Sequence, residues 1–141
     1  MAALKINLED FAMGMTWSSD LFDSAHYLDT DTGEVLFISD GVDEDEIPPD
    51  LEDNPRYVLI RPIEASAAFR IMEDFVETLA DSATAWRLDA ALRRPKPFRR
   101  FKDALYDFPQ VQESWYAFER EAHREIATAW CADRGIEVEW T

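Results

Sequence analysis

The chain has 141 residues, a length typical of one domain with its own hydrophobic core. Its formal net charge is -16, yet 47% of its residues are hydrophobic, which excludes an intrinsically disordered chain. No run approaches the roughly 18 apolar residues of a membrane span, and the amino-terminal sequence does not resemble a secretory signal. A single cysteine, Cys131, excludes an internal disulfide. We therefore expect one domain, 1–141, of a cytoplasmic protein that contacts no membrane.

The first half of the chain predicts one short helix and three strands. Asn7 is a good N-cap for a helix over residues 8–15. The apolar runs AHYLD and EVLFIS flank a loop with Asp, Thr and Gly, which predicts a hairpin over residues 25–39. Both faces of the second run are apolar, so we expect that strand to be covered on both sides. The acidic residues 40–54 predict an exposed connection with one helical turn, and RYVLI before Pro62 predicts a third strand.

The second half predicts four helices and a last short strand. Apolar residues recur at helical spacing in residues 64–79, which predicts the first of these helices. A second helix starts at Asp81 or Ser82, and a third occupies residues 98–108. The fourth and longest begins near Pro109, and Gly135 is well placed as its C-terminal cap. Strands come first and helices second, so we expect an α+β fold with a small antiparallel sheet from the N-terminal half packed against a helical C-terminal half.

Several stretches of the chain carry a resemblance to a known family. They are YLDTDTGEVLFISDG, DLEDNPRYVLI, FRIMEDFVETL, PFRRFKDALYDFP and the WYAFE block, in that order. Together they run from about Tyr27 to Gly135, and FRRFKDAL is the most recognisable block. The sequence resembles a bacterial family catalogued as uncharacterised protein family 0158. The resemblance implies neither an activity nor a cofactor.

Residues that could support catalysis are scarce. Nucleophilic catalysis needs a nucleophile beside a base, usually His, and the chain has only His26 and His123. His26 lies in a predicted strand. We interpret His123 as a half-buried residue and Cys131 as a small core residue. One Cys and two distant His residues exclude a usual structural zinc site. We therefore assign no catalytic, metal-binding or cofactor-binding residue, expect no cofactor, and favour a function that is not enzymatic.

Carboxylates suggest one alternative function. Residues 29–34 resemble the start of an EF-hand loop, but Gly33 takes the fifth position, where a ligand belongs, and Asp40 takes the twelfth. We interpret these residues as a hairpin loop that uses Asp and Gly for backbone reasons. Further carboxylates crowd residues 43–53 in a solvated setting. A weak divalent-ion-dependent site, or an enzyme, that uses Asp29 and the acidic loop 43–53 stays an alternative.

Positive charge is concentrated in one short stretch. Residues 1–60 hold 15 acidic and 2 basic residues, whereas residues 61–110 hold 8 acidic and 9 basic ones. The segment RRPKPFRRFK, residues 93–102, has six cations and no acidic residue. We call it the basic segment. Its cations are Arg93, Arg94, Lys96, Arg99, Arg100 and Lys102.

Two explanations of the basic segment require no nucleic acid. In the first, its cations are structural: they complement the dipole at the end of the second helix, or they face the acidic loop 43–53. In the second, they form a contact surface for an acidic protein or for a second copy of the chain. Aromatic residues that follow the segment would serve as anchors if exposed. These are Tyr106, Phe108, Trp115 and Tyr116.

A third explanation is a nucleic-acid-binding regulator that uses the same segment. Cations interleaved with Phe98 and Phe101 resemble phosphate contacts combined with base stacking. Both Phe residues fit the apolar stripe of the third helix, however, so we expect them in the core, and the net charge of -16 repels polyanions. The sequence therefore favours a non-enzymatic, cytoplasmic binding or regulatory module that contacts an acidic partner surface through residues 93–102.

Overall fold

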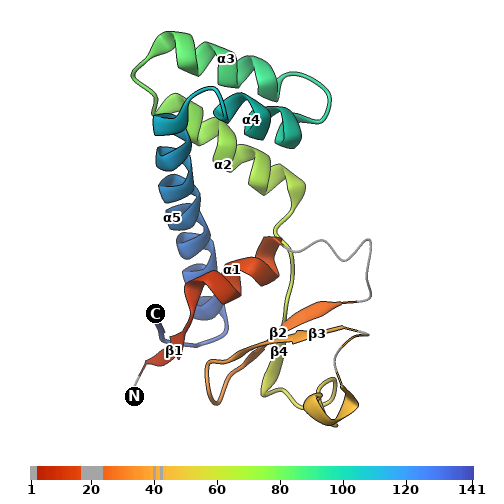
Figure 1. The fold of residues 1–141 in the computed structure, drawn as a ribbon. Helices are drawn as coiled ribbons and strands as arrows, with labels where there is room; N and C mark the ends of the chain where they lie inside the picture. Colours follow the sequence, from red (N-terminus) through yellow and green to blue (C-terminus); the bar gives the residue numbers. More distant parts are fainter. Residues whose placement is uncertain (1–2, 17–23, 40, 42) are drawn as a thin grey trace. The chain divides into compact units, whose positions relative to one another are not determined.

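The fold is that of a computed structural model, which describes residues 3–16, 24–39, 41 and 43–141 (Figure 1). Within these residues the chain forms five α-helices, a short 3-10 helix and two small sheets, which confirms the α+β class. The chain divides into two compact units. Unit 1 comprises Met1–Ile63 and Arg124–Thr141, and unit 2 comprises Glu64–His123. The single domain expected from the chain length stays a prediction.

The larger sheet of unit 1 has three antiparallel strands. β2 (Ala25–Asp29) is central and pairs with β3 (Val35–Ile38) and with β4 (Tyr57–Ile60), as Figure 1 shows. The hairpin and the third strand are confirmed. The expectation that the second hairpin strand is covered on both sides is wrong. β3 lies at the edge of the sheet, and the side chain of Phe37 on one of its faces remains 41% exposed.

Helix α1 (Leu8–Thr16) packs on this sheet, in contact with β2 and β4. The side chain of Asn7 accepts a hydrogen bond of 3.0 Å from the backbone N–H of Asp10, which confirms the predicted cap. Gly14 faces the sheet, and a Cβ there would lie 2.9 Å from the Cβ of His26. The absence of a side chain at this position lets the helix approach the strands closely.

A second, two-stranded sheet joins the ends of the chain. β1 (Leu4–Ile6) pairs in parallel with β5 (Val138–Trp140). The last strand was predicted, but β1 was not. Phe11 packs edge-on against Trp130 and Trp140, with ring centroids 5.1 and 5.6 Å apart. The buried core of unit 1 consists of Ile6, Leu8, Phe11, Met15, Leu28, Ile60, Ala127 and Cys131.

The connection between β3 and β4 is polar. It contains the 3-10 helix η1 (Glu44–Glu46), whose three acidic residues are exposed. Leu51 is buried at 8% exposure and anchors the connection. The prediction of an exposed acidic connection with one helical turn is therefore confirmed.

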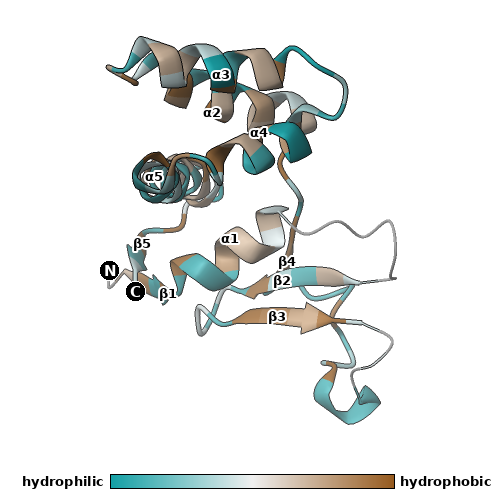
Figure 2. Ribbon diagram, turned by 45° about the horizontal axis from the view of Figure 1, so that its top comes forward, coloured by the Kyte–Doolittle hydropathy of each residue, from teal (hydrophilic) through white to brown (hydrophobic). Residues whose placement is uncertain are grey.

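Unit 2 is helical. It contains α2 (Ala65–Glu77), α3 (Ser82–Leu92), α4 (Pro97–Leu105) and the first part of α5 (Pro109–Asp133), which confirms the four predicted helices. Each helix carries both hydrophobic and hydrophilic residues, as the colours in Figure 2 show. The apolar side chains meet in a core made of Met72, Phe75, Val76, Leu88, Leu92, Phe101, Leu105 and Trp115. No helix in the described part of the chain combines the length and apolar character needed to cross a bilayer.

Helix ends follow local sequence signals. The Asp81 carboxylate accepts a hydrogen bond of 3.1 Å from the N–H of Ala83 at the start of α3. At the end of α5, Gly135 adopts a φ of 72°. The next N–H, from Ile136, donates a hydrogen bond of 2.9 Å to the Cys131 carbonyl. The start of α3 at Asp81 or Ser82 and the glycine cap of α5 were both predicted, because each depends on residues close in sequence.

Candidate functional site

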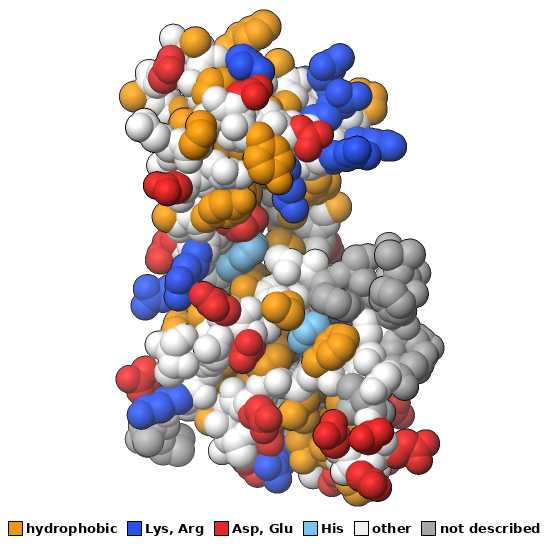
Figure 3. All heavy atoms as spheres, viewed as in Figure 1, with side chains coloured by type: hydrophobic (Ala, Val, Ile, Leu, Met, Phe, Trp, Pro, Cys, Tyr) orange, Lys and Arg blue, Asp and Glu red, His pale blue; other side chains and the backbone are white. Residues whose placement is uncertain are grey.

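The basic segment spans the turn between α3 and α4 and the first six residues of α4. Pro95 and Pro97 prevent α3 from continuing, because proline lacks an N–H and restricts the residue before it. Lys96 reverses the chain with a left-handed backbone, φ 57° and ψ 57°, and Pro97 opens α4. The turn brings α3 and α4 together as packed neighbours. Figure 3 shows Lys and Arg side chains gathered at this end of unit 2.

Three of the six cations have partners within unit 2. The Arg93 guanidinium donates to carboxylates of Asp89, at 3.0 Å, and Glu73, at 3.1 Å. Both hydrogen bonds raise the pKa of Arg93, with Asp89 the larger cause. Arg99 lies 4.0 Å from Asp103, and Nε of Arg100 donates to the Pro95 carbonyl at 2.8 Å. The structural explanation therefore applies best to Arg93, which links the end of α3 to α2.

The other three cations are open. Arg94, Lys96 and Lys102 are all exposed. Within residues 64–123, no carboxylate forms an ion pair with any of them. The basic segment is therefore one paired arginine, two loosely held arginines and three cations that can pair with another molecule.

A hollow of about 350 Å³ lies between α3 and α4, and one of the open cations, Arg94, lines it. Its lining combines small apolar side chains, an indole ring and charged groups. The lining residues are Trp86, Arg87, Ala90, Ala91, Arg94, Arg100, Asp103 and Ala104. Trp86 is 73% exposed, so most of its ring faces solvent. Two members of the basic segment, Arg94 and Arg100, thus share a surface with an exposed aromatic residue.

Sequence reasoning missed Trp86 and Arg87 as members of this surface. One signal could have revealed Trp86: the apolar stripe of α3, which includes Leu88 and Leu92, leaves Trp86 outside it. Arg87 is held in place by two contacts. Its guanidinium donates a hydrogen bond of 2.8 Å to the Asp107 carboxylate and lies 5.0 Å from the centre of the Phe108 ring.

The aromatic residues near the segment divide into core and surface. Tyr106 is 71% and Tyr116 57% exposed, whereas Trp115 is buried and Phe108 half-buried. The expectation that both Phe98 and Phe101 lie in the core is wrong for Phe98. Phe101 is fully buried against Trp115, but Phe98 lies in the first turn of α4 beside exposed residues and is 38% exposed.

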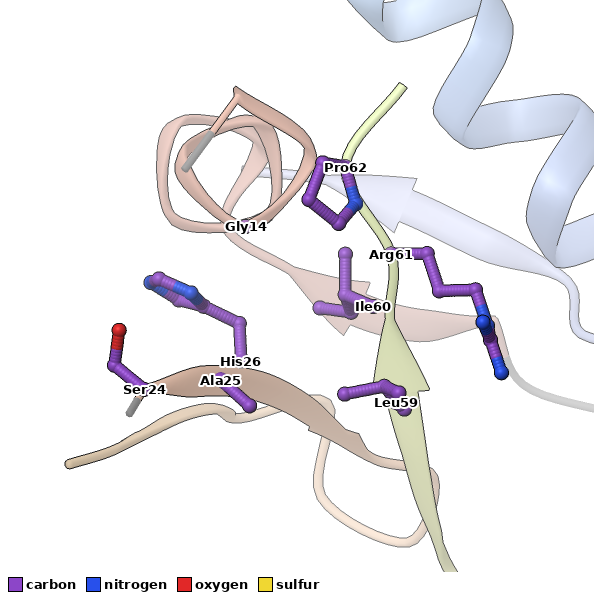
Figure 4. A pocket seen from close by; sticks show the side chains of 8 residues that line it. All are labelled: Gly14, Ser24, Ala25, His26, Leu59, Ile60, Arg61 and Pro62. Atoms are coloured by element: carbon purple, nitrogen blue, oxygen red, sulfur yellow. The ribbon is translucent and has the colours of Figure 1, made fainter. Parts of the chain in front are cut away.

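A second hollow, of about 240 Å³, lies in unit 1 between the end of α1 and the sheet (Figure 4). It is lined by Gly14, Ser24, Ala25, His26, Leu59, Ile60, Arg61 and Pro62. His26 is buried, at 5% exposure, and its ring lies 4.9 Å from the ring of Phe37. Burial lowers the pKa of His26, although Asp10 acts in the opposite direction. The imidazole is therefore neutral near pH 7.

The remaining candidate nucleophile and base are core residues. Cys131 is fully buried, which confirms its assignment to the core, and burial raises the pKa of its thiol to about 11. His123 is 8% exposed and so more buried than predicted, and burial lowers its pKa against the opposing charge of Glu119. A protonated thiol is a poor nucleophile, so Cys131 is not activated in this fold.

The loop at residues 29–34 is a hairpin loop, as predicted. Nε and Nη2 of Arg56 donate to both carboxylate oxygens of Asp29, at 2.7 and 2.8 Å. The hydrogen bond from Arg56 is the main reason why the pKa of Asp29 falls to about 2, and an N–H from Asp31 adds to it. Asp29 therefore serves the hairpin. Among the described residues, no three His, Cys, Asp or Glu side chains group as a metal ion would require.

Comparison with known proteins places the chain in a family. Residues 2–140 match the model of the family described as Uncharacterised protein family (UPF0158). The chain belongs to this family. UPF0158 protein PA5073 from Pseudomonas aeruginosa is 31% identical over 138 residues, which cover 97% of this chain and 88% of that protein. The resemblance is thus confirmed and extends to both sides of residues 27–135. No solved structure matches the chain.

Proposed function

We propose that this member of the UPF0158 family is a non-enzymatic, cytoplasmic binding module that contacts an acidic protein surface through residues 93–102. One observation carries the proposal. Arg94 and Lys96 lie in the turn between α3 and α4 and Lys102 lies within α4, all three exposed and without a carboxylate partner in residues 64–123. The free, buried thiol of Cys131 agrees with a reducing compartment.

The open cations have no evident role in folding. Exposed ion pairs stabilise a protein by only about 0–1 kcal/mol, and these three cations lack even a pair within unit 2. A group of cations on a chain of net charge -16 does, however, orient the molecule toward negative surfaces. Such charge contrast mainly increases the rate and specificity of association.

A protein partner is favoured over nucleic acid. The carboxylates of Asp89 and Asp103 lie beside the cations, where they would meet a continuous phosphate backbone. The overall charge of the chain also opposes long polyanions. A folded protein presents separate carboxylates, which can pair with the open cations and avoid these acidic groups.

Polyglutamate is a suitable probe for the basic segment. Fluorescence polarisation of a labelled polyglutamate peptide should show binding at low ionic strength that weakens by about tenfold or more near 0.15 M salt. Reversing two open cations together, Arg94→Glu with Lys102→Glu, should abolish this binding. Circular dichroism should stay unchanged, because both side chains are exposed.

A matched control tests whether the effect is local. Lys5→Glu with Arg61→Glu changes the net charge equally at exposed positions of unit 1. This control should retain binding to polyglutamate. Equal loss of binding in both double variants, or no binding of the unmodified chain at low salt, contradicts the proposal. If the first variant unfolds, Arg94→Gln with Lys102→Gln makes the same comparison without new like-charge contacts.

A further inference from the structure

Trp86 is an exposed aromatic ring beside an apolar depression. It is 73% exposed, the largest fraction among the large hydrophobic residues that the structure describes. Beside it, Ala90, Ala91 and Ala104 contribute small side chains to the lining of the hollow. An indole ring and methyl groups thus line one hollow, which suits an inserted aliphatic side chain. Exposed Trp residues next to pockets are also typical anchors of protein interfaces.

Guanidinium groups border the same hollow. Arg94 has no carboxylate partner within residues 64–123. Arg100 uses Nε to hold the Pro95 carbonyl at 2.8 Å, which orients its guanidinium and leaves the other N–H groups able to donate. Such oriented guanidiniums match carboxylates well, because they donate two parallel hydrogen bonds. The rim of the hollow is therefore suited to carboxylates.

Apolar and cationic features therefore meet at one place. Asp103 also lines the hollow, 4.0 Å from Arg99, and it disfavours a dense run of phosphates there. We propose that the hollow between α3 and α4 binds an aliphatic side chain of an acidic peptide segment, whose flanking carboxylates pair with Arg94 and Arg100. This inference rests on the proposed function and specifies which acidic segments the surface prefers.

Two labelled peptides separate the apolar contribution from charge. One has Leu between pairs of glutamates, Glu-Glu-Leu-Glu-Glu, and the other has Ala in place of Leu. The Leu peptide should bind the unmodified chain about tenfold more tightly, because burying the larger side chain adds roughly 1.5 kcal/mol, which corresponds to a tenfold change. Equal affinity of the two peptides overturns the inference.

A substitution of Trp86 tests whether the Leu side chain of the peptide binds in the hollow. Trp86→Ala should reduce affinity for the Leu peptide to that for the Ala peptide and leave the Ala peptide unaffected. Tyr106→Ala is the control, because Tyr106 is 71% exposed and does not line the hollow. It should leave both affinities unchanged. Equal weakening of both peptides by Trp86→Ala, or an effect of Tyr106→Ala as large as that of Trp86→Ala, contradicts the inference.

The two proposals fail in different ways. If polyglutamate binds and requires Arg94 and Lys102, but Leu adds nothing, only the hollow is wrongly assigned. If no acidic peptide binds at low salt, the proposed function fails as well. A single-stranded oligonucleotide of equal charge provides the third arm. Tighter binding of the oligonucleotide, lost in Trp86→Ala, would overturn the peptide assignment in favour of base stacking.

Discussion

Two arginines, one in each unit, have opposite roles. In unit 1, Arg56 donates two hydrogen bonds to Asp29, whose side chain is only 7% exposed, and so ties β4 to the hairpin. In unit 2, Arg94 is exposed and has no carboxylate partner in residues 64–123. The difference shows that the setting of the partner decides the role. A buried carboxylate makes an arginine part of the fold, whereas an arginine without one can contact another molecule.

Core substitutions test whether the units are energetically separate. Phe11→Ala in unit 1 and Phe101→Ala in unit 2 each remove a fully buried ring, so each should lower the free energy of unfolding by about 3–5 kcal/mol. If the chain is one domain, urea unfolding should show a single transition for both variants. Loss of amide-exchange protection confined to the substituted unit would instead show two independent domains.

Two glycines with positive φ provide a finer comparison within unit 1. Gly33→Ala should cost about 3 kcal/mol or more, because φ is +81° and a Cβ would overlap the backbone oxygen of Lys5. Gly135→Ala should cost only about 1 kcal/mol, because φ is +72° but nothing lies within 4 Å of the added Cβ. Urea midpoints measure both values. Equal costs would contradict the close approach of the hairpin loop to β1.

The contrast between paired and open charges predicts a pH dependence. Asp29→Asn should lower the free energy of unfolding by about 2 kcal/mol at pH 7, because the pKa of Asp29 falls from 3.8 to about 2 on folding. A depressed carboxylate pKa stabilises the fold above about pH 4, and this stabilisation is lost as the pH falls toward 2. The difference between the variant and the unmodified chain should therefore shrink across that range.

Asp103→Asn is the matched control for this prediction. Its carboxylate lies 4.0 Å from Arg99, and both side chains are well exposed. The change in stability should stay within about 0.5 kcal/mol at every pH. An effect as large as that of Asp29→Asn would show that the surface pair is also structural.

The smallest expected effects concern the open cations. Lys96→Gly should raise the free energy of unfolding by about 1 kcal/mol, because glycine adopts the left-handed backbone at φ 57° without strain. Arg94→Ala should change it by less than about 0.5 kcal/mol. Both should weaken polyglutamate binding in the polarisation assay. Marked destabilisation by either would place these cations in the fold and not in a binding surface.

Local signals made much of the fold predictable. The Asn7 and Asp81 caps and the glycine after α5 involve atoms only a few residues apart, so sequence alone reveals them. β1 was missed because three residues are too few to show periodicity, and its partner β5 lies at the other end of the chain. The pairing of Arg56 with Asp29 was missed for a related reason, since the two are 27 residues apart.

The sequence by itself determined the order of helices and strands, the helix ends and the concentration of cations in residues 93–102. Only the tertiary structure decided that Arg93 is paired, that Arg94, Lys96 and Lys102 are open, and that Trp86 borders a hollow. The physical reason is the distance along the chain between the residues that interact. Charge content and helix capping depend on neighbours along the chain, whereas ion pairing and exposure depend on which side chains the packing of α2, α3 and α4 brings within a few ångströms.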